Sequence, residues 1–244
     1  VEVFSVAWRD YAQHLSDNGN RAWLRRLHHA PVDLMLQDEL NHPSLLWANY
    51  RRPRRSYRRV SIVHHLRSSE PDHPALLRRL YREVERLYLN SLDAYVANSL
   101  TTLASVQALL SPTNRAAIPA LVAYPAADHL PMQEDISLPS LAERAALPGP
   151  LRLLFVGNIM RRKGLHTVLE ALARLPAGLC RLSVVGKINA DDGYTNDLLA
   201  QAHRLPPGTV TFLGRIPDAQ LIRLYQEHHV LAAPAFEGFG ITYL

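Results

Sequence analysis

The sequence predicts an α/β protein built on two parallel β-sheets. Short apolar runs of strand length alternate with segments whose apolar residues recur at helical spacing, most regularly in the second half of the chain. Strands that are continuously apolar are typical of parallel sheets covered by helices. The 244 residues are enough for two domains of ordinary size.

Alternating elements justify this prediction in the second half. The apolar runs predict strands at 151–156, 181–185, 210–213 and 230–233. Helical spacing predicts helices between them at 165–175, 196–205 and 218–228. Because a helix separates each strand from the next, consecutive strands are expected to run parallel through βαβ crossovers.

The first half contains the same kinds of element in a less regular order. Its apolar runs predict strands at 32–36, 60–63 and 94–97. Helical spacing predicts a helix over 74–89. Ser99 is the expected N-cap of a further helix that runs through Leu110.

A proline-rich stretch separates the two halves. We expect an N-terminal domain at 1–126, a linker with one short helical turn at 127–149, and a C-terminal domain at 150–244. Residues 1–6 alternate like a strand in progress, and 238–244 resemble a loop that enters a helix. We therefore expect an internal fragment in which each domain is incomplete at its outer end.

Amino-acid composition indicates which classes of protein this chain can belong to. The single cysteine, Cys180, cannot form an internal disulfide and fits a reducing compartment, so a cytoplasmic location is expected. No apolar run approaches the roughly 20 residues that a membrane span needs. The net charge of +5 and the isoelectric point near 9.5 favour anionic partners.

Glycines and charged side chains gather where the predicted strands of the second half end. The residues that mark the four loops are Gly157, Gly186, Gly214 and Glu237. Ligands bind outside the carboxyl ends of parallel strands, where glycine permits close approach and helix N-termini offer N–H groups. We therefore expect a phosphate site, with the Lys163 ammonium at a strand-to-helix junction.

Each of these features taken singly also has a structural explanation. A glycine after a strand is commonly turn chemistry, and a loop carboxylate such as Glu237 is commonly only solvated. The loop that begins at Gly157 has neither the GxxxxGK[ST] nor the GxGxxG spacing. The prediction of a phosphate site therefore depends on the four loops converging.

Several blocks of the second half together resemble the donor domain of group 1 (family 4) retaining glycosyltransferases. The blocks are LLFVG at 153–157 with RKG at 162–164, VVG at 184–186, TFLGR at 211–215 and PAFEGFG at 234–240. The first half is similar more loosely, through 62–65 and 95–99. The resemblance implies the GT-B fold, in which two Rossmann-like domains face each other across a cleft that holds a nucleotide sugar.

The resemblance also implies roles for individual residues. His64 and Glu237 are the expected catalytic residues, and Lys163 is the expected phosphate-binding lysine. The full set expected to bind the donor is Gly157, Asn158, Arg162, Lys163, Gly186, Lys187, Gly214, Arg215, Ile216, Gly238, Phe239 and Gly240.

The implied reaction transfers a sugar from a nucleotide-diphosphate sugar to an acceptor hydroxyl, with retention of configuration. Negative charge grows on the departing diphosphate, and Lys163, Arg162 and the amides of the Gly-Phe-Gly segment would stabilise it. Asn158 stands where the family has an arginine, so either Arg161 or Arg162 is expected to replace it. No cofactor and no metal are expected, since the sequence has no Asp-x-Asp triplet and its paired histidines lack ligand spacing.

Other interpretations stay open. A nucleotide-sugar epimerase or a sugar phosphorylase has a similar fold, and a truncated copy could bind a partner without catalysis. The basic segment at 51–59 is either a solvated loop or a peripheral contact with anionic lipid at the cytoplasmic face of a membrane, which would suit a carbohydrate or lipid-linked acceptor. The same segment favours a nucleic-acid-binding protein, but no recognition motif or interleaved aromatic platform accompanies it.

Overall fold

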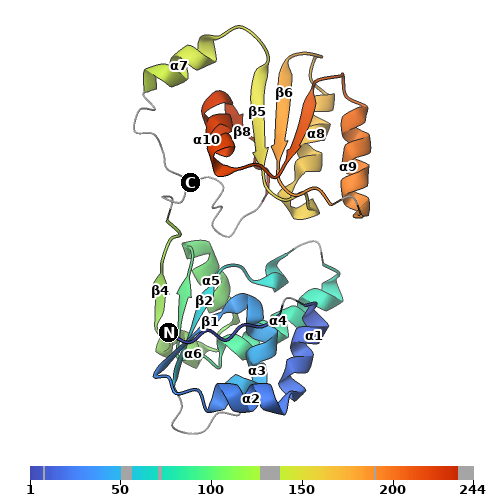
Figure 1. Ribbon diagram of the computed structural model, residues 1–244. Coiled ribbons are helices and arrows are strands. Elements are labelled where there is room, and N and C mark those ends of the chain that lie inside the picture. Colours follow the sequence, from blue (N-terminus) through green and yellow to red (C-terminus); the bar gives the residue numbers. More distant parts are fainter. Residues whose placement is uncertain (8, 51–56, 71–72, 127–137, 190, 236–244) are drawn as a thin grey trace. The chain divides into compact units, whose positions relative to one another are not determined.

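The computed structural model describes residues 1–7, 9–50, 57–70, 73–126, 138–189 and 191–235. The chain divides into two compact units, Val1–Pro125 and Ala126–Leu244 (Figure 1). Both units contain a parallel sheet with helices, so the α/β prediction is confirmed. Among the described helices, none has the length and apolar character needed to cross a membrane.

Unit 1 is built on a four-stranded sheet in the order β1-β2-β3-β4. Its strands are β1 (Leu34–Asp38), β2 (Arg58–Val63), β3 (Ala94–Ala97) and β4 (Ala120–Val122). Its helices are α1 (Tyr11–Ser16), α2 (Arg21–His28), α3 (His42–Tyr50), α4 (Ala75–Leu89), α5 (Leu100–Leu109) and α6 (Pro112–Ala117), with short 3-10 turns η1 (Asp17–Gly19), η2 (Glu39–Asn41) and η3 (Arg67–Ser69). The strands lie side by side in the order in which they occur along the chain. Because parallel strands are joined by right-handed crossovers, the connecting helices α3, α4 and α5 all lie on the same face of the sheet.

Aromatic and branched side chains fill the space between this sheet and its helices. Tyr88 of α4, Tyr95 of β3 and Val63 of β2 are almost completely buried. The Tyr88 hydroxyl donates to the Ser61 hydroxyl at 2.9 Å, so the ring is buried with its polar atom satisfied. On the other face of the sheet, several apolar side chains stay exposed, namely Leu34, Leu36, Ile62 and Leu121.

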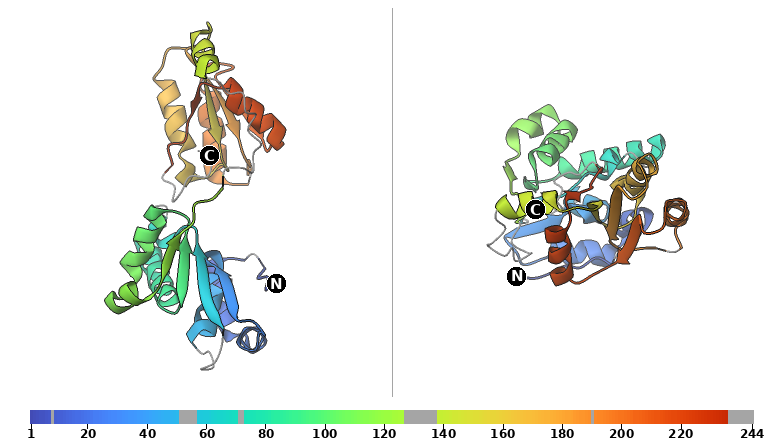
Figure 2. Two further views of the ribbon diagram at one scale, coloured as in Figure 1. Left: turned by 90° about the vertical axis from the view of Figure 1, so that its left-hand side faces the viewer. Right: turned by 90° about the horizontal axis from the view of Figure 1, so that it is seen from above.

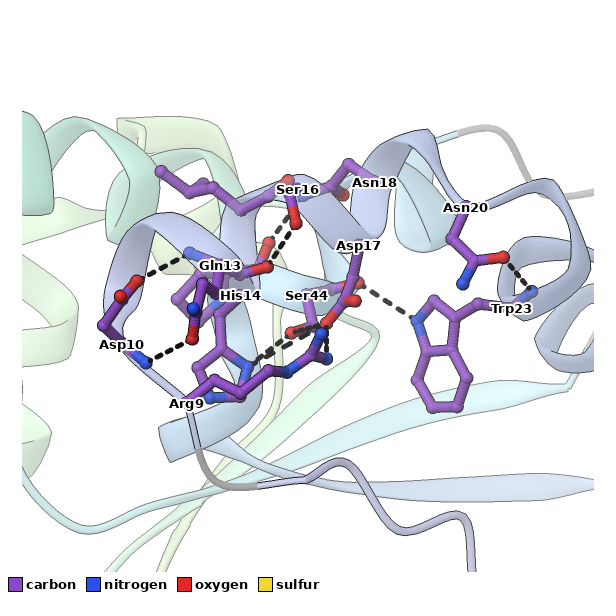
Figure 3. A network of polar contacts seen from close by, with 12 residues as sticks. Arg9, Asp10, Gln13, His14, Ser16, Asp17, Asn18, Asn20, Trp23 and Ser44 are labelled. Atoms are coloured by element: carbon purple, nitrogen blue, oxygen red, sulfur yellow. Dashed lines mark hydrogen bonds and ion pairs between the residues drawn. The ribbon is translucent and has the colours of Figure 1, made fainter.

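A polar network fastens α1 and η1 to α3 (Figure 3). Asp17 accepts hydrogen bonds from Arg9 Nη2 at 2.6 Å and from the Ser44 hydroxyl at 2.8 Å. Because the one hydroxyl proton of Ser44 goes to Asp17, His14 Nδ1 donates to the Ser44 oxygen, 2.8 Å away. A nucleophilic triad would instead place the histidine between serine and carboxylate. This network therefore holds α1 and η1 against α3 and is not a catalytic site.

Residues 1–6 do not form a strand, contrary to the prediction from their alternation. The backbone of this segment pairs with no strand of the described sheet. Val1 and Val3 are exposed, and only Phe4 packs partly against the core. Alternating side chains are not sufficient for a strand, because the backbone N–H and C=O groups also need a neighbouring strand.

Unit 2 is built on a sheet in the order β7-β6-β5-β8. Its strands are β5 (Leu151–Val156), β6 (Cys180–Val185), β7 (Val210–Gly214) and β8 (Val230–Leu231). Its helices are α7 (Leu138–Ala146), α8 (Leu165–Ala173), α9 (Gly193–His203) and α10 (Asp218–Glu227), with a 3-10 turn η4 (Arg161–Lys163). The chain steps from β5 to β7 in one direction and then returns to β8, so α8 and α9 cover one face and α10 the other (Figures 1 and 2).

Among the boundaries in unit 2 that differ from the prediction, two have identifiable reasons. The last strand is shorter than expected: the Ala232 N–H still donates to the Leu154 carbonyl at 2.7 Å, but Pro234 has no N–H with which to extend the ladder. Helix α9 begins earlier than expected because Asp192 caps it, accepting the Thr195 N–H at 3.2 Å and its hydroxyl at 3.0 Å.

A buried ion pair joins β2 to the residue before β3. Asp93 Oδ2 accepts both the backbone N–H of Arg59, at 2.9 Å, and its guanidinium Nε, at 3.2 Å. The Nη1 atom of the same guanidinium donates to the Asn49 carbonyl at 2.7 Å. Arg59 is only 4% exposed, so its charge is satisfied inside unit 1.

This pairing corrects the prediction for the basic segment at 51–59. Arg59 and Tyr57 are buried and therefore unavailable to anionic lipid, whereas Arg58 is exposed. The rest of the segment, 51–56, lies outside the described residues.

We expect Asp93→Ala to lower the free energy of unfolding of unit 1 by about 3–5 kcal/mol, because the Arg59 guanidinium would stay buried without its carboxylate. All three tryptophans of the chain (Trp8, Trp23 and Trp47) lie in unit 1, so tryptophan fluorescence during urea unfolding measures this unit. The control is Glu83→Ala, which breaks an exposed pair with Arg86 and should cost less than about 1 kcal/mol. Equal, small losses in both variants would contradict the assignment.

Candidate functional site

The parallel ladder of unit 2 brings three of the predicted loops side by side. Val156 is in register with Val185, so Gly157 and Gly186 directly follow paired residues. The Gly157 N–H donates to the Val185 carbonyl, and the Gly186 N–H donates to the Gly214 carbonyl, each at 2.9 Å. The sequence prediction that these glycine loops share one edge of the sheet is confirmed by this geometry.

The loops after β5 and β6 touch backbone to backbone. A Cβ atom placed on Gly186 would lie 1.9 Å from the Gly157 carbonyl oxygen, which is far inside any permitted contact. Gly186 also has φ of +150°, a conformation that other residues rarely adopt. This position therefore requires glycine for both space and backbone conformation.

Asn158 and Ile159 fasten the same two loops together. The Asn158 side-chain oxygen accepts the Lys187 N–H at 3.3 Å, and the Ile159 N–H donates to the Lys187 carbonyl at 3.2 Å. Ile159 is buried, while Asn158 and Lys187 are exposed at the edge. Asn158, where the resemblance implies an arginine, thus helps to hold the two loops together at this edge of the sheet.

Lys163 lies across the first of these loops. A Cβ atom on Gly157 would meet the Lys163 Cδ and Cε atoms at 3.6 Å, so the lysine stem runs over the bare glycine backbone. Lys163 ends the turn η4, and Gly164, with φ of +72°, leads directly into α8 without a side-chain cap. The first N–H groups of α8 and the half-buried lysine are therefore at the same edge, which is the arrangement that binds anions.

Arg161 contacts an aromatic ring on the next helix. The Arg161 guanidinium carbon lies 4.9 Å from the ring centroid of Tyr194 on α9. The Tyr194 hydroxyl in turn lies 2.8 Å from His166 Nδ1 on α8. Arg161 is thus held toward α9, whereas Arg162 is half-buried beside Lys163 in the chain.

Sequence reasoning missed the contact between Tyr194 and His166. The two residues are 28 positions apart and lie on different helices, and neither belongs to a strand end. No pattern in the sequence indicates that they meet. Their effect on the site is to hold the turn that carries Arg161 against α9.

The remaining predicted donor-binding residues are placed as follows. Gly214 ends β7 with φ of +67°, Arg215 is exposed and Ile216 is half-buried. The segment after β8 reaches the start of α8, because a Cβ on Gly164 would lie 2.9 Å from Pro234 Cγ. The predicted residues Glu237, Gly238, Phe239 and Gly240 lie outside the described residues.

His64 lies in unit 1, just after β2, at the carboxyl edge of that sheet. Its Nε2 atom is 3.9 Å from Asp38 Oδ1 at the end of β1, and both side chains are about half exposed. The His64 carbonyl accepts the Thr102 hydroxyl of α5 at 3.4 Å. An exposed histidine beside a carboxylate can bind hydroxyl groups or stabilise positive charge.

Two buried carboxyl groups hold the chain that follows His64. Glu39 accepts the His65 N–H at 3.4 Å, and Glu85 of α4 accepts the Ser68 N–H at 3.0 Å. Burial, followed by the nearby Glu85, raises the pKa of Glu39 to about 8. Burial likewise raises the pKa of Glu85. The only signal in the sequence is that Glu85 interrupts the apolar face of the predicted helix 74–89.

Among the described residues, no three His, Cys, Asp or Glu side chains are grouped so that they could hold a metal ion.

We expect Gly186→Ala to loosen the edge of unit 2, because the new methyl group would collide with the Gly157 carbonyl. Amide hydrogen exchange followed by mass spectrometry should show faster exchange in peptides that cover 157–164 and 186–189. The matched control is Gly178→Ala, where φ is +80° but no atom lies within 4 Å, so only backbone strain of about 1 kcal/mol is added. Unchanged exchange in the Gly186 variant would contradict the close contact.

We expect Glu39→Gln to become more stable relative to the wild type as pH rises from about 5 to about 8. The pKa of Glu39 rises from 4.5 to about 8 on folding, through burial and the charges of Glu85 and Asp38. In this interval the folded chain holds a proton that the unfolded chain has lost, so ionisation destabilises the wild type but not the variant. Urea unfolding followed by tryptophan fluorescence measures the difference. A difference that does not change with pH would show that Glu39 is ionised in the fold.

Comparison with known proteins finds a family that part of unit 2 matches. Residues 142–244 match the family of glycosyl transferases group 1. No curated protein matches the chain by sequence.

Solved structures share the fold of both units. Sucrose-phosphate synthase from Thermosynechococcus elongatus matches 97% of this chain and 59% of its own, with a TM-score of 0.67 and 19% identity. HepE from Anabaena, solved in complex with UDP and glucose, matches 93% of this chain and 60% of its own, with a TM-score of 0.65 and 18% identity. WaaG, a glycosyltransferase involved in lipopolysaccharide biosynthesis, matches 98% and 64%, with a TM-score of 0.59 and 19% identity.

The chain thus spans about three-fifths of the length of these structures. Its two parallel sheets are the Rossmann-like domains of the GT-B fold, as the sequence predicted. Residues 142–244 thus carry the match to the group 1 glycosyl transferases, and both units share the fold of solved structures.

Proposed function

We propose that the protein transfers a sugar from a nucleotide-diphosphate sugar to an acceptor hydroxyl, with retention of configuration and without a metal ion. The group 1 match of residues 142–244 supports sugar transfer. The structure of HepE with UDP and glucose makes a uridine nucleotide the first donor to test. The acceptor is proposed to be a carbohydrate or a lipid-linked carbohydrate.

The observation that carries this proposal is the position of Lys163. Its stem crosses Gly157 at the edge where the loops after β5, β6 and β7 meet, next to the uncapped N-terminus of α8. Charge and backbone N–H groups lie at the same edge there, which suits a diphosphate. A preorganised donor aimed at developing negative charge typically contributes about 3 kcal/mol to transition-state stabilisation.

Arg162 is proposed to supply the second positive charge. Asn158 at the family's arginine position ties the loops together, and Arg161 stacks on Tyr194. Arg162 directly precedes Lys163 in the turn η4. A charge on either side of the leaving diphosphate would favour its departure, which is the step that an oxocarbenium-like transition state requires.

Two further roles remain predictions from the resemblance. His64 is expected to orient the donor sugar, and Glu237 is expected to accept hydrogen bonds from its hydroxyl groups. In the proposed reaction the leaving phosphate takes the acceptor proton, so no side chain is needed as a base. Donor turnover that continues in a strong chelator would support the absence of a metal step, and chelator-sensitive turnover would contradict it.

We expect Lys163→Ala to weaken binding of UDP at least about tenfold, because the diphosphate loses its principal cation. Isothermal titration calorimetry on the whole chain, with UDP, GDP and ADP in parallel, measures this loss and also identifies the preferred base. Arg174→Ala is the control, since Arg174 is an exposed cation at the other end of α8 and should leave the affinity unchanged. Equal affinity in the wild type and the Lys163 variant would contradict the site.

The products distinguish transfer from the competing reactions. A labelled donor sugar should appear on an acceptor or in water, with release of the nucleoside diphosphate. Interconversion of the sugar while it stays attached to the nucleotide would instead identify an epimerase, and phosphate-dependent release would identify a phosphorylase.

A further inference from the structure

Helix α9, which packs beside α8, begins at a point that its neighbours hold firmly (Figure 1). Asp192 caps the helix by accepting both the N–H and the hydroxyl of Thr195. Thr195 is completely buried, and Leu198, one turn later, is 1% exposed. Tyr194 lies between the cap and these buried residues, so its backbone is anchored from both sides.

The Tyr194 side chain joins α9 to both ends of the segment 161–166. Its ring lies under the Arg161 guanidinium, whose carbon is 4.9 Å from the ring centroid. Its hydroxyl is 2.8 Å from His166 Nδ1, and the two rings meet edge to face with their centroids 5.9 Å apart. One anchored side chain thus contacts the segment at its first and its last residue.

Backbone hydrogen bonds stiffen the segment between these two contacts. The Lys163 N–H donates to the Met160 carbonyl at 3.0 Å. The Gly164 N–H donates to the Arg161 carbonyl, and the Thr167 N–H donates to the Gly164 carbonyl, each at 3.0 Å. Gly164 therefore belongs both to the end of the turn η4 and to the start of α8. A displacement of Arg161 would displace Lys163 and the first N–H groups of α8 with it.

We propose that Tyr194 is a positioning residue for the diphosphate of a bound nucleotide. It would act through Arg161 and His166, which hold the turn η4 and the first turn of α8, rather than through a contact of its own with the ligand. Ordering the Lys163 ammonium and the helix N–H groups before the nucleotide arrives lowers the cost of binding. This inference rests on the proposed function, because it concerns the same diphosphate site.

Tyr194 also packs partly against the core of unit 2, so two conservative variants are needed to separate positioning from packing. Tyr194→Phe keeps the ring, and with it both the core contact and the support of Arg161, and loses only the hydroxyl. Arg161→Ala keeps the whole of Tyr194 and changes an exposed residue outside the core. A role in positioning is expected to respond to the second change, whereas packing of the core is not.

The test combines isothermal titration calorimetry of the whole chain with UDP and amide hydrogen exchange. We expect Tyr194→Ala to weaken UDP binding at least about fivefold and to speed exchange in peptides that cover 161–167. Tyr194→Phe should bind within about threefold of the wild type, because its ring still supports Arg161. Arg161→Ala should speed exchange in the same peptides. Unchanged exchange in β6 and β7 checks that unit 2 stays folded.

A double-mutant cycle shows whether Tyr194 acts through Lys163. In the Lys163→Ala background, Tyr194→Ala should weaken UDP binding by no more than about a further twofold, since the group that it positions is already absent. The matched control is Tyr225→Ala, which removes a half-buried tyrosine from α10 on the other face of the sheet. This control should leave both UDP binding and the exchange of 161–167 unchanged.

The outcomes separate this inference from the proposed function. If the wild type binds UDP and Tyr194→Ala binds it equally well, the inference is overturned and the proposed function stands. The same holds if the loss persists undiminished in the Lys163→Ala background, if Tyr225→Ala loses as much, or if exchange of 161–167 is unchanged in both Tyr194→Ala and Arg161→Ala. A wild-type chain that binds none of UDP, GDP and ADP overturns the proposed function and this inference with it.

Discussion

The close contact between the backbones of Gly157 and Gly186 determines the geometry of the candidate site. Because neither residue has a side chain, the loops after β5 and β6 meet directly, and Asn158 and Ile159 can fasten them to Lys187. The bare backbone of Gly157 is also the surface on which the Lys163 stem lies. One steric condition therefore sets the course of the Lys163 stem beside the N-terminus of α8.

The two units stabilise their strand ends by different means. Unit 2 uses glycine and backbone hydrogen bonds between neighbouring loops. Unit 1 uses buried carboxyl groups, because Glu39 and Glu85 accept backbone N–H groups from the chain that follows His64. The raised pKa of Glu39 reflects the free-energy cost of burying its charge. The edge of unit 1 is consequently sensitive to pH.

The spacing of apolar residues along the chain was sufficient to predict most of the fold. The strands 94–97 and 151–156 have their predicted bounds, since each is an apolar run limited by polar residues or glycine. The convergence of Gly157, Gly186 and Gly214 follows from the parallel order of the strands. The sequence could not show that residues 1–6 lack a partner strand, because pairing is a property of neighbours in space.

Contacts between distant residues account for part of what the sequence missed. Helices α1, α2, α3 and α6 and strand β4 were also not predicted, and only a short helical turn was expected where α7 forms. Arg161 and Arg162 are equivalent candidates in the sequence, which does not show that Arg161 stacks on Tyr194 of another helix. Arg59 belonged to a basic segment in the sequence, yet Asp93 and the Asn49 carbonyl hold it inside unit 1. Charge read along the chain does not distinguish an exposed arginine from a buried one, because burial depends on which partner the fold supplies.

The central claim is that a diphosphate binds where the glycine loops of unit 2 meet. The most direct measurement is a backbone amide NMR titration of the chain with UDP. The account predicts that the largest shifts occur at 157–159, 163–167, 186–187 and 214–216, with little change at the opposite end of the unit 2 sheet. Shifts confined to other parts of the chain, with these amides unchanged at saturating UDP, would contradict it.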